Sequence, residues 1–172
     1  MNEHLEQYLK DKYPEIIPDK FHFECSDGWF LILNGAFQEM MSIKTMPRFK
    51  DVPYPQVMQI KEKFGSMRFY IAPLEGGQEY YDRIYTVVTM AEGLSFCTCE
   101  SCGRPGFPRD QRWVKVYCPW CATDSRKTFN NEWVNACLEM IQDEKDYNNK
   151  YKDWDNDALD KLSDLDQELG LE

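Results

Sequence analysis

The spacing of apolar residues in the first part of the chain predicts two helices with a strand between them. Glu3–Tyr13 repeats apolar residues at helical spacing and ends before Pro14, as a short helix does. Polar and apolar residues alternate over Lys20–Cys25, which indicates a half-buried strand. Ser26 or Asp27 is placed to cap a second helix. The apolar stripe of that helix comprises Trp29, Phe30, Ile32, Leu33, Phe37, Met40 and Met41.

A β-hairpin is predicted for Val57–Ala72, after a proline-rich loop. Gly65 and Ser66 supply its tight turn, and Pro73 ends it. Alternation with a period of two assigns the residues of the first strand to two faces. One face would hold Val57, Gln59, Lys61 and Lys63, and the other Met58, Ile60, Glu62 and Phe64.

Three later segments have the apolar spacing of amphipathic helices. The first is Tyr80–Leu94, and the second is Phe129–Ile141 with Thr128 as its cap. The third is Asn156–Leu169, whose leucines are separated by acidic residues. A short strand is expected at Arg112–Tyr117.

These elements predict an α+β fold, in which a hairpin or small antiparallel sheet packs against helices. Residues 97–125, which contain two Cys-x2-Cys pairs, are expected to form a zinc ribbon with four cysteines, inserted after the Tyr80–Leu94 helix. We expect residues 1–142 to form one domain and residues 143–172 to form an acidic helical tail.

Four of the seven cysteines form two Cys-x2-Cys pairs, Cys99 with Cys102 and Cys118 with Cys121. Fifteen residues separate the pairs, within the range typical of a zinc site. Zinc takes four ligands at tetrahedral angles, and a two-residue spacer lets each pair present both thiolates. Because cysteines fill all four positions, no position remains for an activated water, so we expect a structural Zn²⁺ rather than a catalytic one.

Other interpretations of the cysteines remain open. Some of the four can be merely buried thiols, and Cys97 is a substitute ligand with poor geometry beside Cys99. Cys25 and Cys137 lie on apolar stripes and are expected in the core. Cys118-Pro119-Trp120-Cys121 also matches a thiol–disulfide exchange motif, but the upstream pair favours zinc and no βαβ pattern surrounds it.

Charge is concentrated at the end of the chain. Residues 143–172 contain eleven acidic residues and four lysines, and so carry −7 of the net charge of −10. No apolar run approaches the roughly 18 residues of a membrane span, and the start lacks the pattern of a signal peptide. We therefore expect a cytoplasmic protein with no membrane partner, in which cysteines bind metal rather than form disulfides.

The sequence predicts no catalysis. Its two histidines, His4 and His22, belong to no catalytic pattern, and neither a phosphate-binding glycine loop nor a Gly-x-Ser-x-Gly elbow occurs. Its thirty carboxylates can conceal a catalytic pair, but most must be solvated.

A basic cluster on the zinc module leaves nucleic acid open as a partner. Residues 104–127 have a local net charge of +4, with Trp113 and Trp120 nearby. Bases can stack on the aromatic rings while the basic side chains bind phosphates. Pairing with the protein's own acidic tail or an acidic partner is the favoured alternative. The candidate nucleic-acid ligands are Arg104, Arg109, Arg112 and Lys115.

The tail offers a second kind of interaction. Its leucine stripe can dock in a groove of a partner protein or of a second copy of this chain, and its carboxylates can imitate a phosphate backbone. A solubilising role is the simpler interpretation of its charge. The candidate partner-binding residues are Trp154, Leu162, Leu165 and Leu169.

Residues 27–125 resemble a family of small uncharacterised proteins of tailed phages and prophages. The resemblance rests on Lys-Glu-Lys-Phe-Gly-x-x-Arg-Phe-Tyr within Gln59–Tyr70, on Ala91–Ser95, on Cys99–Gly106 and on Trp113 followed by Cys118–Cys121. It implies a phage origin and a second metal-ligand pair after a tryptophan-containing strand. The acidic extension after Asp143 departs from that pattern.

Phage accessory proteins of this size often bind and disable a host factor. By association, the resemblance therefore implies a zinc-stabilised protein in the host cytosol that binds, and inhibits, a host or defence protein.

Overall fold

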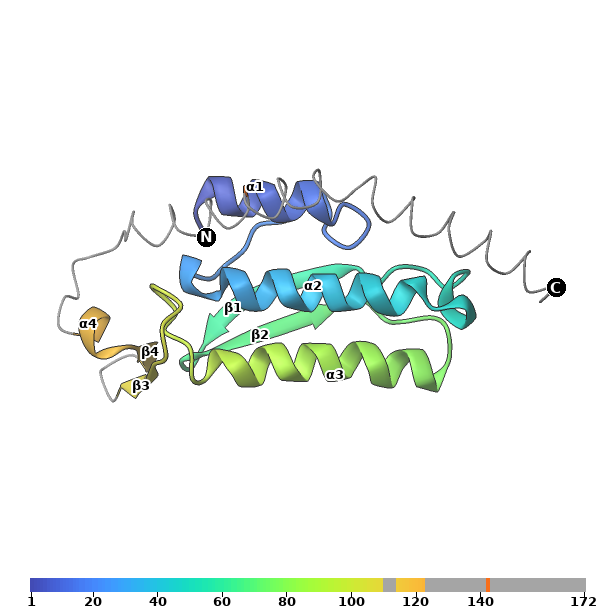
Figure 1. Ribbon diagram of the computed structural model, residues 1–172. Helices are drawn as coiled ribbons and strands as arrows, with labels where there is room; N and C mark the ends of the chain where they lie inside the picture. Colours follow the sequence, from blue (N-terminus) through green and yellow to red (C-terminus); the bar gives the residue numbers. More distant parts are fainter. Residues whose placement is uncertain (110–113, 123–141, 143–172) are drawn as a thin grey trace, which may run out of the picture. The chain divides into compact units, whose positions relative to one another are not determined.

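The computed structural model describes residues 1–109, 114–122 and 142. The chain divides into two compact units, Met1–Val134 and Asn135–Glu172, and the first contains all four paired cysteines. Within the described residues there are four α-helices and two two-stranded antiparallel sheets, which confirms the α+β class (Figure 1). None of the helices in this part of the chain is long and apolar enough to cross a membrane.

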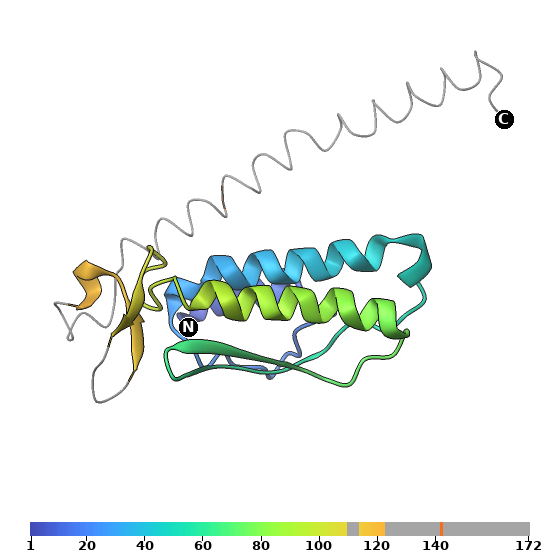
Figure 2. The ribbon, with the colours of Figure 1, turned by 90° about the horizontal axis from the view of Figure 1, so that it is seen from below.

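Two long helices cover one face of a β-hairpin (Figures 1 and 2). The helices are α2 (Phe30–Thr45) and α3 (Gln78–Ser95), and the hairpin consists of β1 (Val57–Lys63) and β2 (Ser66–Ile71). They bury a continuous apolar core, as their predicted stripes require. Its central residues are Leu33, Phe37, Met40, Ile60, Met67, Phe69, Ile84 and Val88.

Helix α1 (Glu3–Lys12) packs beside α2 and confirms the first predicted helix. The ring of Tyr8 lies 5.8 Å from that of Phe30, and the ring of Tyr13 lies 5.4 Å from that of Phe37. Two short 3₁₀ turns, η1 (Asp27–Trp29) and η2 (Pro47–Phe49), flank α2. The predicted cap is wrong, because Ser26 makes no side-chain cap bond and the carboxylate of Asp27 instead accepts the backbone N–H of Asn2.

The hairpin is confirmed, but its turn and its faces differ from the prediction. Lys63 pairs with Ser66, so Phe64 and Gly65 form the turn. A bulge between Val57 and Gln59 leaves Met58 unpaired and exposed, so that Val57 and Ile60 are both buried. The bulge adds one residue to the strand and reverses the predicted alternation at that point.

The strand predicted over Lys20–Cys25 does not form a ladder. Burial alternates as expected, but only Glu24 pairs with β1, in an isolated parallel bridge to Lys61. The backbone N–H of Phe21 is bonded to the carbonyl of Pro18, and that of Phe23 is bonded to the Glu6 carboxylate. These N–H groups are therefore not available for sheet pairing.

The metal module follows α3 and contains β3 (Phe107–Arg109), β4 (Lys115–Tyr117) and α4 (Pro119–Ala122). β3 and β4 pair antiparallel, in agreement with the strand predicted before the second cysteine pair. Arg112 and Trp113 of that predicted strand lie outside the described residues, as do the predicted helices 128–141 and 156–169.

Candidate metal centre

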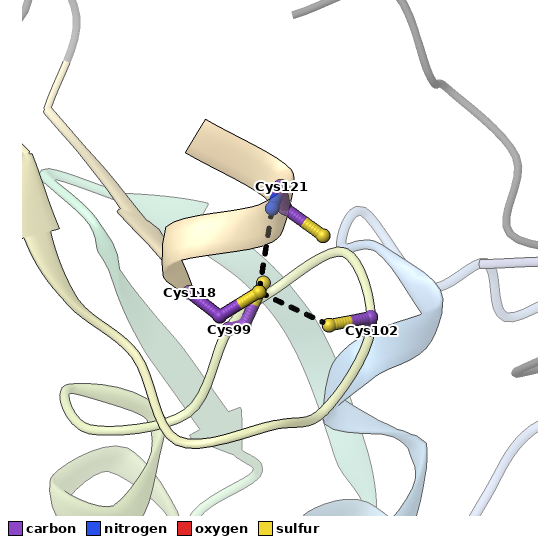
Figure 3. A group of neighbouring side chains, drawn as sticks. All are labelled: Cys99, Cys102, Cys118 and Cys121. Atoms are coloured by element: carbon purple, nitrogen blue, oxygen red, sulfur yellow. Dashed lines mark hydrogen bonds between the residues drawn. The ribbon is translucent and has the colours of Figure 1, made fainter. Parts of the chain in front are cut away.

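The thiols of Cys99, Cys102, Cys118 and Cys121 converge (Figure 3). Their sulfur atoms all lie within 4.8 Å of one another, and those of Cys102 and Cys118 are 3.6 Å apart. Tetrahedral ligands about 2.3 Å from a zinc ion would be about 3.8 Å apart. The predicted ligand set is therefore brought together with spacing that suits a metal ion.

The first pair lies in a tight loop held by its own backbone. The N–H of Gly103 donates to the carbonyl of Cys99 over 2.9 Å, and the N–H of Cys99 donates to the carbonyl of Arg104 over 2.8 Å. Gly103 has a φ of 70°, a left-handed conformation that glycine adopts without a steric penalty. This turn directs both thiols of the pair to the same side.

The second pair lies where β4 passes into α4. Pro119 follows Cys118 at the first position of the helix, where a missing N–H costs nothing. The N–H of Cys121 donates to the sulfur of Cys118 over 3.4 Å, and the N–H of Ala122 donates to its carbonyl over 3.0 Å. The helical turn therefore fixes Cys118 and Cys121 beside each other.

Burial and mutual hydrogen bonding shift pKa values in the cluster of thiols. Three of these thiols, those of Cys99, Cys102 and Cys118, are buried. Burial raises the pKa of Cys102 well above its usual range and that of Cys121 to about 11. For Cys118, burial acts in the same direction, but hydrogen bonds from the N–H of Cys121 and from the neighbouring thiols outweigh it and lower the pKa to about 7. A cation among the sulfurs would favour ionisation of the remaining thiols, and soft thiolates suit zinc and similar metals.

A partly buried ion-pair network supports the first cysteine loop. Glu100 is only 3% exposed, and its Oε1 accepts from Lys115 Nζ over 2.8 Å. Lys115 also donates to Glu62 Oε2 of the hairpin over 2.9 Å. The other carboxylate oxygen of Glu100 has no hydrogen-bond partner among the described residues. Lys115 therefore links the cysteine loop to the hairpin through two carboxylates.

The start of α2 packs directly on the same loop. The N–H of Gly28 donates to the carbonyl of Glu100 over 2.9 Å, and the indole N–H of Trp29 donates to the carbonyl of Thr98 over 3.1 Å. A Cβ atom on Gly28 would lie 2.2 Å from the carbonyl oxygen of Cys99. Only glycine fits this contact, which joins the metal module to the helical body.

Cys25 and Cys97, the remaining cysteines among the described residues, lie outside the cluster. Cys97 is exposed, and its thiol donates to the carbonyl of Leu94 over 3.3 Å. Cys25 is buried in the body, as predicted, and burial raises its pKa to about 12. Cys137 lies outside the described residues.

The predicted basic cluster is not a uniform free surface. Arg104 is exposed and stacks over Trp120 at 5.4 Å, whereas Lys115 is held by the two carboxylates. Arg109 is half-buried, lies 4.1 Å over the ring of Phe107, and donates to the carbonyl of Tyr117. Arg112 and the predicted tail residues Trp154, Leu162, Leu165 and Leu169 lie outside the described residues.

Sequence reasoning missed Gly28, Glu62 and Glu100. The only available signals were a glycine next to a predicted helix cap and a carboxylate inside a Cys-x2-Cys pair. Neither pattern specifies a contact with a distant segment.

Comparisons with protein-family models, with curated proteins and with solved structures found no match. The chemistry of the site therefore follows from its geometry. Four converging thiols form a donor set that could hold one metal ion, with the start of α2 and Lys115 tying it to the rest of the fold.

Proposed function

We propose that the four cysteines bind one structural Zn²⁺ ion and that the protein acts by binding rather than by catalysis. The supporting observation is the set of four sulfur atoms within 4.8 Å of one another. Four thiolates complete a tetrahedral zinc site and leave no position for an activated water or a substrate. Zinc then contributes to folding, because the unfolded chain has no preformed site.

Metal analysis of the purified protein tests the zinc proposal. We expect about one zinc ion per chain, and its loss together with a lower melting temperature in Cys102→Ser or Cys118→Ser. Cys97→Ser is the matched control, because Cys97 lies in the same loop region but outside the cluster. A wild-type protein without metal, combined with an unchanged melting temperature in Cys102→Ser, would refute the proposal.

For the biological role, we propose a phage accessory protein that binds and inhibits a host or defence protein in the host cytosol. The resemblance to a phage family supports the origin. The acidic segment after Asp143 and its leucine stripe support capture of a partner, since an amphipathic helix can dock in a groove. The same stripe can also mediate a homodimer.

An affinity pull-down from bacterial lysate, with and without nuclease, tests this role. Partner capture would be supported by a protein that co-purifies in stoichiometric amounts after nuclease treatment and no longer co-purifies when residues 155–172 are deleted. Replacing Leu162, Leu165 and Leu169 by serine is the sharper variant, because it keeps the charge of the segment. If every co-purifying protein is lost after nuclease treatment, the partner-capture role is contradicted.

A second candidate function is a nucleic-acid-associated zinc ribbon. The observation in its favour is Arg104 stacked on Trp120, which is 67% exposed. The ion pairs of Lys115 count against it, because that side chain already has two carboxylate partners. Charge reversal at Arg104 should abolish binding to single strands at low salt if this function is correct.

A further inference from the structure

The outer face of the β-hairpin is built differently from the face that packs on the helices. Ile60 pairs with Phe69, and both are buried. The pairs on either side of them, Gln59 with Tyr70 and Lys61 with Arg68, project to the opposite face because side chains alternate along a strand. Lys63, which lies beyond Lys61 on the same face, is exposed.

This outer face is basic although the whole chain is acidic. Lys61, Lys63 and Arg68 share the face, and Lys20 lines the hollow beside Lys61. Glu24, which lines the same hollow, adds one negative charge, and its carboxylate accepts a hydrogen bond from Gln59 over 2.8 Å. A local excess of positive charge on a chain with a net charge of −10 is complementary to a polyanion.

Two aromatic rings accompany these cations. Tyr70 is 45% exposed and Phe64 is 68% exposed. Lys61 Nζ lies 5.7 Å from the centre of the Tyr70 ring, and Lys63 Nζ lies 5.4 Å from that of Phe64. Phe64 also has a φ of 55°, a left-handed conformation that is unfavourable for a large side chain. An exposed, strained phenylalanine does not serve the core, which points to a role at the surface.

A hollow beside Tyr70 offers space for a ligand. It has a volume of about 660 Å³ and lies between the 20–24 segment and the hairpin. Lys20, His22, Gln59 and Lys61 line it together with Tyr70. Its volume falls within the roughly 300–1,000 Å³ of small-ligand sites, so a nucleotide unit can enter it.

We propose that this hairpin face binds single-stranded nucleic acid. Unpaired bases stack on Tyr70 and Phe64, while Lys61, Lys63 and Lys20 bind the phosphates. Stacking requires bases that are not already paired, so a duplex is a poor ligand. An acidic peptide would satisfy the lysines but would not use the two exposed rings. The proposal involves neither the cysteines nor the acidic tail, so it stands independently of the partner-capture function.

Binding of a fluorescent oligothymidylate of about 15 nucleotides to the full-length zinc-loaded protein tests the proposal. We expect Tyr70→Ala to weaken binding about fivefold or more, since one base–aromatic stack is lost. Lys61→Gln with Lys63→Gln should weaken it further and reduce the slope of log K against log salt by about 1.4, at about 0.7 per phosphate contact.

Each control makes a comparable substitution, of an exposed aromatic residue or of two cationic residues, away from the hairpin face. Tyr81→Ala removes an aromatic ring of similar exposure, 42%, from α3. Lys50→Gln with Arg83→Gln removes the same charge from other surfaces, and circular dichroism verifies the fold of every variant. Retained affinity in these controls supports the proposal.

Four outcomes would overturn it. They are no binding by the wild type at low salt, equal losses in the controls, a larger loss in Arg104→Gln than in the hairpin variants, or equally tight binding to polyglutamate that Tyr70→Ala does not affect.

Discussion

Gly28 allows the first cysteine loop to pack closely against the start of α2, because glycine has no side chain. Its N–H bonds the carbonyl of Glu100, and the backbone of the first cysteine loop occupies the space where a Cβ would be. The nearest atoms to that Cβ would be the Cys99 oxygen at 2.2 Å and the Gly103 nitrogen at 2.6 Å. Backbone atoms cannot move aside as the end of a flexible side chain can.

Gly28→Ala should therefore destabilise the protein by about 3 kcal/mol and weaken metal retention, because the cysteine loop must move to relieve the overlap. Chemical denaturation and metal analysis measure the two effects.

Gly35→Ala is the matched control for this glycine. Gly35 lies inside helix α2, and a Cβ there would meet nothing within 4 Å. Because alanine is the better helix former, this change should stabilise the protein by about 0.5–1 kcal/mol. Similar stability of the two variants would contradict the close packing of the cysteine loop on Gly28.

At this scale, the sequence indicated the ligands but not their support. The two-residue spacers identified Cys99, Cys102, Cys118 and Cys121 as ligands, because the spacing that lets a pair of cysteines bind one metal ion is local in sequence. Gly28 carried no such signal, since the loop that it contacts is remote in sequence.

The turn of the β1–β2 hairpin contains a residue that is unusual at its position. A two-residue turn in which both φ angles are positive favours Asn-Gly, but Phe64 occupies the first position with a φ of 55°. Gly65 occupies the second with a φ of 77°. The predicted turn, Gly65 and Ser66, is therefore one residue too late along the chain.

Phe64→Asn should stabilise the hairpin by about 1 kcal/mol, since asparagine tolerates the left-handed conformation that strains phenylalanine. Thermal denaturation checks this effect. The same variant should bind oligothymidylate less tightly, because it removes an exposed ring.

Gly65→Ala provides the opposite comparison. Its positive φ and the Val114 side chain, 3.0 Å from the added Cβ, should make this variant less stable than the wild type. A destabilised Phe64→Asn would show that the Phe64 ring contributes to folding rather than to a surface role.

For the unit Met1–Val134, Lys115 connects the metal module with the hairpin body. Lys115→Met leaves the carboxylate of Glu100, 3% exposed, without its cationic partner. Breaking a fully buried pair on one side costs about 3–5 kcal/mol, and because Lys115 is 26% exposed we expect a smaller loss of about 2 kcal/mol in chemical denaturation. Adding Glu100→Gln should recover part of it, because the uncompensated charge is then removed.

Arg83→Met is the control for this ion pair. It breaks the ion pair between Arg83, which is 39% exposed, and Glu79, which is 53% exposed. Exposed ion pairs contribute little to the free energy of unfolding. A comparable loss in both variants would contradict a buried linking role for Lys115.

Metal removal should unfold the module and body of this unit together. Trp29 belongs to the body and donates to the carbonyl of Thr98 next to the first ligand. A strong chelator should therefore lower the melting temperature by the same amount in tryptophan fluorescence and in far-ultraviolet circular dichroism. Two separate transitions would contradict a single cooperative unit.

Local sequence patterns were sufficient to predict helices α1, α2 and α3, the presence of the β1–β2 hairpin, the α+β class and the four cysteines that come together. Each of these depends on short-range regularity, namely helical or alternating periodicity and a two-residue ligand spacer. Four features are evident only in the folded structure: the bulge at Met58, the missing ladder at 20–25, the fit of Gly28 and the Lys115 network. These depend on contacts between remote segments: Lys115 and Glu62 are 53 residues apart, and no local pattern encodes such a pairing.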